Sequence, residues 1–70
     1  MTLQELRDQK LKLAEQADQI LKKAGEEQRH DLTKEEDAQF DAIHADIDKL
    51  TKQIQREERQ DAVRASLSES

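Results

Sequence analysis

The feature that most constrains the fold is an apolar repeat in the second half of the chain. Large apolar residues recur there at alternating steps of three and four, at Phe40, Ile43, Ile47, Leu50 and Ile54. This spacing places all five side chains on one narrow stripe of an α-helix, as at the a and d positions of a coiled coil. The chain has one glycine and no proline, which leaves few places for the tight turns of a sheet. The sequence therefore predicts an all-α fold.

The first half of the chain carries a second, wider apolar stripe. At about 100° per residue its members fall within an arc of roughly 180°; they are Leu3, Leu6, Leu11, Leu13, Ala14, Ala17, Ile20, Leu21 and Ala24. Thr2 and Glu5 have the spacing of a capping box, and Gly25 stands where a left-handed residue commonly ends a helix. We expect a helix over about residues 3–24.

The second helix also begins at a capping box, formed by Thr33 and Glu36. The connection between the helices is expected at residues 25–33, and the second helix at about 34–65. Its apolar stripe stops at Ile54 and acidic residues follow. Residues 1–65 are thus expected to form one helical domain, and residues 66–70 a linker or frayed end.

The two stripes match in length, which predicts an antiparallel two-helix hairpin in which the numbers of facing residues add to about 57. Leu3 would then face Ile54, and Ala17 would face Phe40. The first stripe is wider than the second, so Leu13, Ile20 and Ala24 should stay uncovered and promote self-association. The residues expected to form this self-association seam are Leu3, Leu6, Leu13, Ile20, Phe40, Ile43, Ile47, Leu50 and Ile54. A domain-swapped dimer would use the same seam.

Lys10 is a charged residue near the middle of the first apolar stripe, opposite Ile47. A polar residue at such a position can specify the register or the oligomer order of a coiled coil. Alternatively, its ammonium group reaches out of the seam to Asp46 or Asp48.

The charge pattern argues against several kinds of partner. Charged residues make up 41% of the chain and aromatic residues 1%, and the net charge is −5. The middle of the chain is acidic and there is no basic stripe, so we expect no nucleic-acid surface. No apolar run approaches about 18 residues and no helix has a basic polar face, so we expect no membrane partner.

The sequence offers little for catalysis or for metal binding. His44 shares a helix face with Asp41 and Asp48, which allows a metal-binding hairpin. No matching motif lies on the first helix, so a solvated face is favoured, and His30 is interpreted as a surface histidine. The chain has no cysteine, and its acid pairs have no evident pocket. We therefore expect no enzyme, no cofactor and no metal site.

The second half of the chain contains Arg29, then Leu32-Thr33-x-Glu35-Glu36, then Phe40-Asp41 and the seam from Ile43 to Arg56. In these residues it resembles the N-terminal scaffold, or delta, domain of tailed-phage major capsid proteins with the Hong Kong 97-like fold. Leu3-x-Glu5-Leu6-Arg7, Ala17, Ile20-Leu21 and Ala24 extend the resemblance to roughly residues 1–58. One departure is that His30-Asp31 separates Arg29 from Leu32, where the family more often has a single residue.

The resemblance implies a function in capsid assembly. Such domains precede the shell domain, point into the procapsid, promote assembly of capsomers, and in many members are removed by a maturation protease. The implied partners are other copies of the chain and that protease, and the implied location is the host cytoplasm and then the procapsid interior. On this interpretation the 70 residues are part of a longer protein. The alternative is a free-standing, small acidic helical regulator that binds a protein partner.

Overall fold

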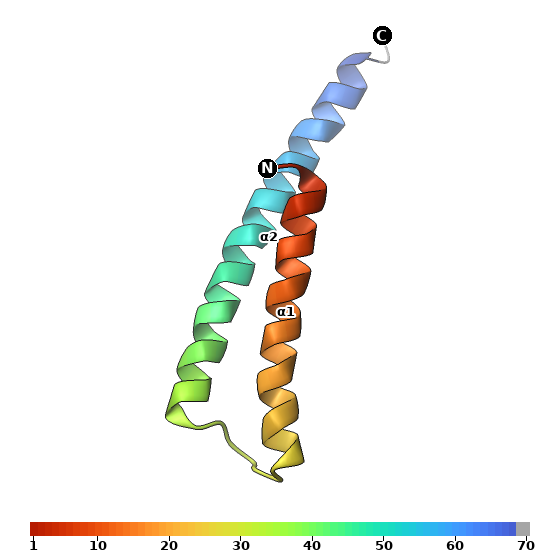
Figure 1. Cartoon of the computed structure of the whole chain (residues 1–70). Coiled ribbons are helices and arrows are strands. Elements are labelled where there is room, and N and C mark those ends of the chain that lie inside the picture. Colours follow the sequence, from red (N-terminus) through yellow and green to blue (C-terminus); the bar gives the residue numbers. More distant parts are fainter. Residues whose placement is uncertain (69–70) are drawn as a thin grey trace.

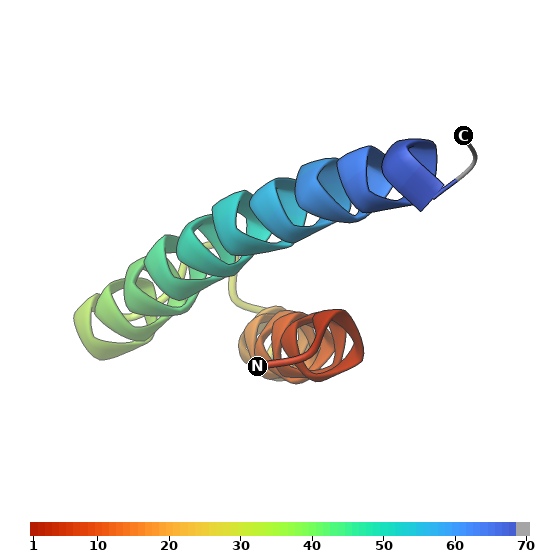
Figure 2. The same ribbon diagram turned by 90° about the horizontal axis from the view of Figure 1, so that it is seen from above.

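Two antiparallel helices form the whole of the described structure. The computed structural model describes residues 1–68, in which α1 (Leu3–Glu26) is followed by a connection over residues 27–33 and by α2 (Lys34–Ser68). The helices lie side by side and cross at a slight angle (Figures 1 and 2). The molecule is elongated, with principal extents of 59 × 18 × 17 Å. The predicted all-α helical hairpin is confirmed.

Side-chain caps fix the start of each helix. The Oγ1 atom of Thr2 accepts a hydrogen bond of 3.2 Å from the amide of Glu5. At α2 the exchange is reciprocal: the amide of Glu36 donates to Thr33 Oγ1 at 3.1 Å, and the amide of Thr33 donates to the Glu36 carboxylate at 3.0 Å. These bonds satisfy amide groups that have no partner within a helix. The helices accordingly begin at Leu3 and Lys34, where the capping patterns place them.

The end of α1 differs from the sequence-based expectation. Gly25 lies within the helix and has no positive φ, whereas Gln28 has φ 56°. The amide of Gln28 donates to the carbonyl of Gly25 at 3.1 Å, and the amide of Arg29 donates to the carbonyl of Ala24 at 2.9 Å. This is a Schellman motif with its left-handed residue at Gln28. The prediction that Gly25 takes this conformation is wrong, because glycine is also tolerated inside a helix and so does not by itself mark the last turn.

The end of α2 is also later than the sequence suggested. The helix continues through Ser68, so residues 66–68 of the expected linker or frayed end are helical. Residues 69 and 70 of that expected linker lie outside the described residues. The apolar stripe ends at Ile54, but Arg64, Ala65 and Leu67 are good helix formers and sustain the helix. The last turns of α2 therefore project beyond the start of α1, and residues 55–68 are all exposed (Figure 1).

The best-packed part of the hairpin lies near the free end of α1. Leu6, Leu50 and Ile54 form a buried cluster, against which Leu3 and Leu13 pack. The helices diverge toward the connection (Figure 1).

The pairing of the two helices differs from the predicted register. Because α1 runs to Glu26, the midpoint of the connection is residue 30, and the numbers of facing residues add to about 60 instead of 57. The predicted register is therefore wrong by close to one helical turn.

Candidate self-association surface

The nine predicted seam residues all lie partly or fully out of solvent within the single chain. Three of them, Leu6, Leu50 and Ile54, are buried, with 5%, 9% and 7% of their surface exposed. The other six are half-buried, and they are Leu3, Leu13, Ile20, Phe40, Ile43 and Ile47. The hairpin thus covers the seam only in part, most completely at one end.

The part of the first apolar stripe that faces α2 differs from the sequence-based expectation. Ala24 was expected to be uncovered but is buried, as is Ala17, and Leu13 packs against the buried cluster. The exposed apolar side chains of α1 are instead Leu11 and Leu21, at 59% and 49%.

The buried line of α1 follows from helix geometry. Leu6, Ala17 and Ala24 are spaced by 11 and 7 residues, close to three and two full turns, so they lie on one line along the helix. Two alanines on this line let the helices approach without large side chains between them. This line could have been found in the sequence, but the wide apolar arc of the first helix obscured which part of it faces α2.

The connection is held by an ion-pair cluster centred on Arg29. Its guanidinium group donates to both carboxylate oxygens of Glu36, at 2.5 and 3.0 Å, and to Glu27 at 2.7 Å. The Glu36 side chain is 13% exposed. The hydrogen bonds from Arg29, followed by that from the Thr33 amide, lower the pKa of Glu36 to about 2, and the same pairing raises the pKa of Arg29. One carboxylate therefore joins the end of α1 to the cap of α2.

Sequence reasoning named these residues through the family resemblance but did not predict their pairing. Arg29 and Glu36 are seven residues apart across a non-helical connection, so no helical or strand periodicity connects them. The two-pronged geometry that makes an arginine–carboxylate pair strong depends on how the connection bends. The sequence signals were therefore the resemblance, which names Arg29 and Glu36, and the capping box at Thr33, which names Glu36; neither predicts that the two residues pair.

The structure shows what lies beside Lys10 and His44, the two residues that the sequence singled out for a special role. Lys10 is half-buried, and among residues 1–68 no ion pair joins it to Asp46 or Asp48. The His44 ring lies against Phe40, with ring centroids 4.5 Å apart and planes inclined by 40°. In the described part of the chain no three His, Cys, Asp or Glu residues are grouped so that they could hold a metal ion. Neither of the two described helices is long and apolar enough to cross a membrane.

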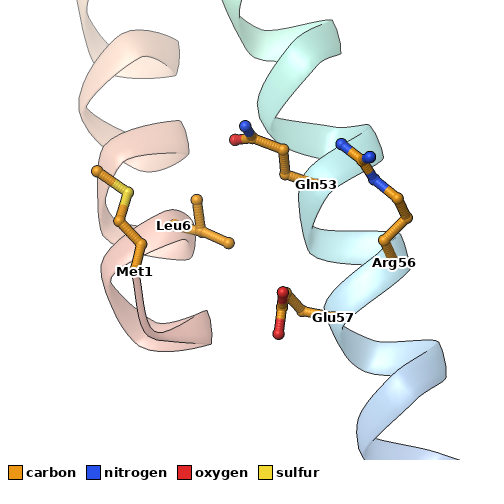
Figure 3. A pocket seen from close by; sticks show the side chains of 5 residues that line it. All are labelled: Met1, Leu6, Gln53, Arg56 and Glu57. Atoms are coloured by element: carbon orange, nitrogen blue, oxygen red, sulfur yellow. The ribbon is translucent and has the colours of Figure 1, made fainter.

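A shallow hollow lies where the start of α1 meets α2, and Figure 3 shows the side chains that line it. Leu6 and Gln53 point toward each other between the helices, and Glu57 points toward the start of α1. Nearby, Arg7 and Glu58 form an ion pair at 3.7 Å, with both side chains about half exposed. An exposed pair of this kind contributes little to stability. The hollow is open, and its geometry fits packing against another surface.

Comparison of the chain with protein-family models, with curated proteins and with solved structures gives no match.

Proposed function

We propose that this chain is the assembly scaffold segment of a phage major capsid protein. It promotes formation of capsomers and procapsids through helical self-association and is later removed by a maturation protease. It works without catalysis and without a cofactor, first in the host cytoplasm and then in the procapsid interior.

The incomplete burial of both apolar stripes is the observation that carries the self-association. The chain has an accessible surface of 5806 Å². A compact monomer of 8.1 kDa is expected to expose about 4,500 Å², so the hairpin exposes about 1,300 Å² more. A standard protein–protein interface covers about 800 Å² of each partner. Residues 55–68 at the end of α2 are all exposed and supply part of this excess, and the six half-buried seam residues supply another part, which an interface with a second chain would cover.

Two further features support the capsid proposal in particular. The residues that carry the resemblance to scaffold domains, Arg29, Thr33 and Glu36, make the junction between the helices, so the resemblance falls on a part of the chain with a defined structural role. The acidic middle of the chain would repel DNA, which fits a segment that is removed as the capsid is filled. Weak pairing between hairpins becomes strong when many copies line one shell.

Sedimentation of two matched variants tests the self-association. Leu50→Asp places a carboxylate in the buried cluster and is expected to abolish association and to lower helicity by circular dichroism. Gln55→Asp introduces the same residue at an exposed position of the same helix and should leave the sedimenting mass unchanged. A wild-type chain that is a stably folded monomer at micromolar concentration would contradict the proposal.

The genome tests the capsid assignment independently. We expect the reading frame to continue past Ser70 into a β-rich shell domain, beside genes for a portal and a protease. A stop codon at that point would instead favour the small regulator. In the full-length protein, deletion of residues 1–58 should prevent formation of closed procapsids, as seen by electron microscopy of the expressed particles.

A further inference from the structure

On one side of the hairpin, each helix carries a row of residues that combines seam residues with exposed polar neighbours. On α1 the row contains Gln9, Leu13, Gln16 and Ile20, at steps of four, three and four. On α2 a matching row contains Gln39, Ile43, Asp46, Leu50 and Gln53, at steps of four, three, four and three. Residues at these spacings share one face of a helix. Each helix therefore presents a row with coiled-coil spacing whose apolar members belong to the edge of the seam and whose polar members lie outside it.

Two hollows show that these rows open on the same side of the molecule. One hollow brings Gln9 and Leu13 of α1 together with Leu50 and Gln53 of α2. The other hollow is nearer the connection, where Gln16 and Ile20 meet Gln39 and Ile43. Because each hollow joins the same two rows, the hollows lie along one continuous surface, which we call the glutamine face.

The glutamine face is unusual in this chain because it carries little charge. Twelve residues line its two hollows and the small depression between Gln9 and Lys12, and three of them, Lys12, Asp46 and Lys49, are charged. At the 41% charge of the whole chain, about five would be expected. The floor is formed by Leu13, Ile20, Ile43 and Leu50, all partly or fully buried, and the four glutamines are exposed around it.

We propose that the glutamine face of one chain packs against the glutamine face of a second copy, giving a four-helix bundle dimer. The inference rests on the self-association proposed above and specifies which surface makes it. The hairpin as a whole exposes about 1,300 Å² more than a compact monomer of its mass, and the glutamine face is one part of that exposed surface. The 3-4 spacing on both rows suits the interlocking side-chain packing of helix bundles.

The glutamine rim has the chemistry that a contact with a second copy requires. In a two-fold interface the same patch of both chains meets, so a rim that carries one sign of charge brings like charges together. A glutamine amide both donates and accepts hydrogen bonds, and it can therefore pair with its own kind. The rim thus suits self-pairing better than pairing with a strongly charged partner.

A pair of double variants with identical chemistry tests the surface. Gln16→Glu with Gln39→Glu adds two negative charges to the glutamine face of each chain. Gln19→Glu with Gln55→Glu adds the same charges at exposed positions that lie off both rows and line neither hollow. Glutamine and glutamate have similar helix propensities, so circular dichroism should be alike for all three proteins.

Sedimentation equilibrium over micromolar concentrations is the readout. The wild type and the Gln19/Gln55 variant should sediment as dimers, and the dissociation constant of the Gln16/Gln39 variant should rise at least ten-fold. Addition of 1 M NaCl should restore part of that loss, because salt screens the added charges.

The outcomes separate this inference from the proposed function. If the wild type associates but the Gln16/Gln39 variant associates equally well, or if both variants weaken alike, the glutamine face is the wrong surface and self-association stands. A wild-type trimer would also overturn the two-fold pairing. A wild-type monomer would overturn both.

Discussion

The ending of α1 gives the sharpest prediction, because glycine and the left-handed residue occupy different positions there. Gly25 is exposed and helical, and a Cβ atom added to it would meet nothing within 4 Å. Gly25→Ala should therefore raise the free energy of unfolding by about 0.5 to 1 kcal/mol, because alanine loses less backbone freedom in a helix than glycine does. Gln28→Gly should raise it by a similar amount, since φ 56° is strained for a residue with a side chain.

Thermal unfolding followed by circular dichroism measures both effects. An unfolding entropy of roughly 2.1 cal/mol/K per residue converts these energies into a rise in Tm of about 3 to 7 °C for either variant. All proteins must be compared at one chain concentration, because association would make Tm depend on it. Gln28→Ala is the matched control, since alanine is also strained in the left-handed region, and its Tm should stay close to that of the wild type.

The opposite pattern would refute the reasoning. If Gly25 were the left-handed residue in solution, Gly25→Ala would lower the stability, because alanine does not fit that conformation. Gln28→Gly would then also lower it, since the glycine would stand at an ordinary position and only increase the freedom of the unfolded chain. The two variants together thus report where α1 ends.

Two further predictions concern the seam and the connection. The Leu6 side chain is 5% exposed, so Leu6→Ala should lower the free energy of unfolding by about 2 to 3 kcal/mol. The Leu11 side chain is 59% exposed, so Leu11→Ala should change this free energy by less than about 0.5 kcal/mol. Urea unfolding measures both, and equal effects would show that Leu11 is covered. The pKa of Glu36 is lowered to about 2 in the folded chain, so its contribution to stability is complete above its ordinary value near 4.5 and is lost as the pH falls toward 2. Glu36→Gln should accordingly reduce the acid dependence of stability in this pH window, and an unchanged dependence would show that Arg29 and Glu36 are not paired in solution.

Much of the fold could be predicted from the chain because local signals agree with one another. The stripe from Phe40 to Ile54, the capping boxes at Thr2 and Thr33, and the absence of proline all indicate two helices. The errors arose where a signal has two physical meanings. Gly25 is compatible with a helix interior as well as with a helix end, and its misplacement shifted the predicted register by close to one turn.

The remaining errors have the same character. The loss of apolar residues after Ile54 ends the packing against α1 but does not end α2, because backbone hydrogen bonds and good helix formers sustain a helix that packs on nothing. The pairing of Arg29 with Glu36 depends on a backbone path with no repeating pattern, so it becomes visible only in three dimensions. For the candidate surface, the sequence indicates which residues are apolar, but the rotation of α1 about its own axis decides which of them remain open.

Because α2 is long, a small change in the direction of one of its ends produces a large displacement of the other end. Its 35 residues form one unbroken helix of about 52 Å. A tilt of about 10° at Ser68 would sweep the Arg29 junction sideways by about 9 Å over such a length. The direction of the last turns of α2 therefore determines the position of the opposite end of the hairpin. It also determines which neighbouring molecules that end can contact.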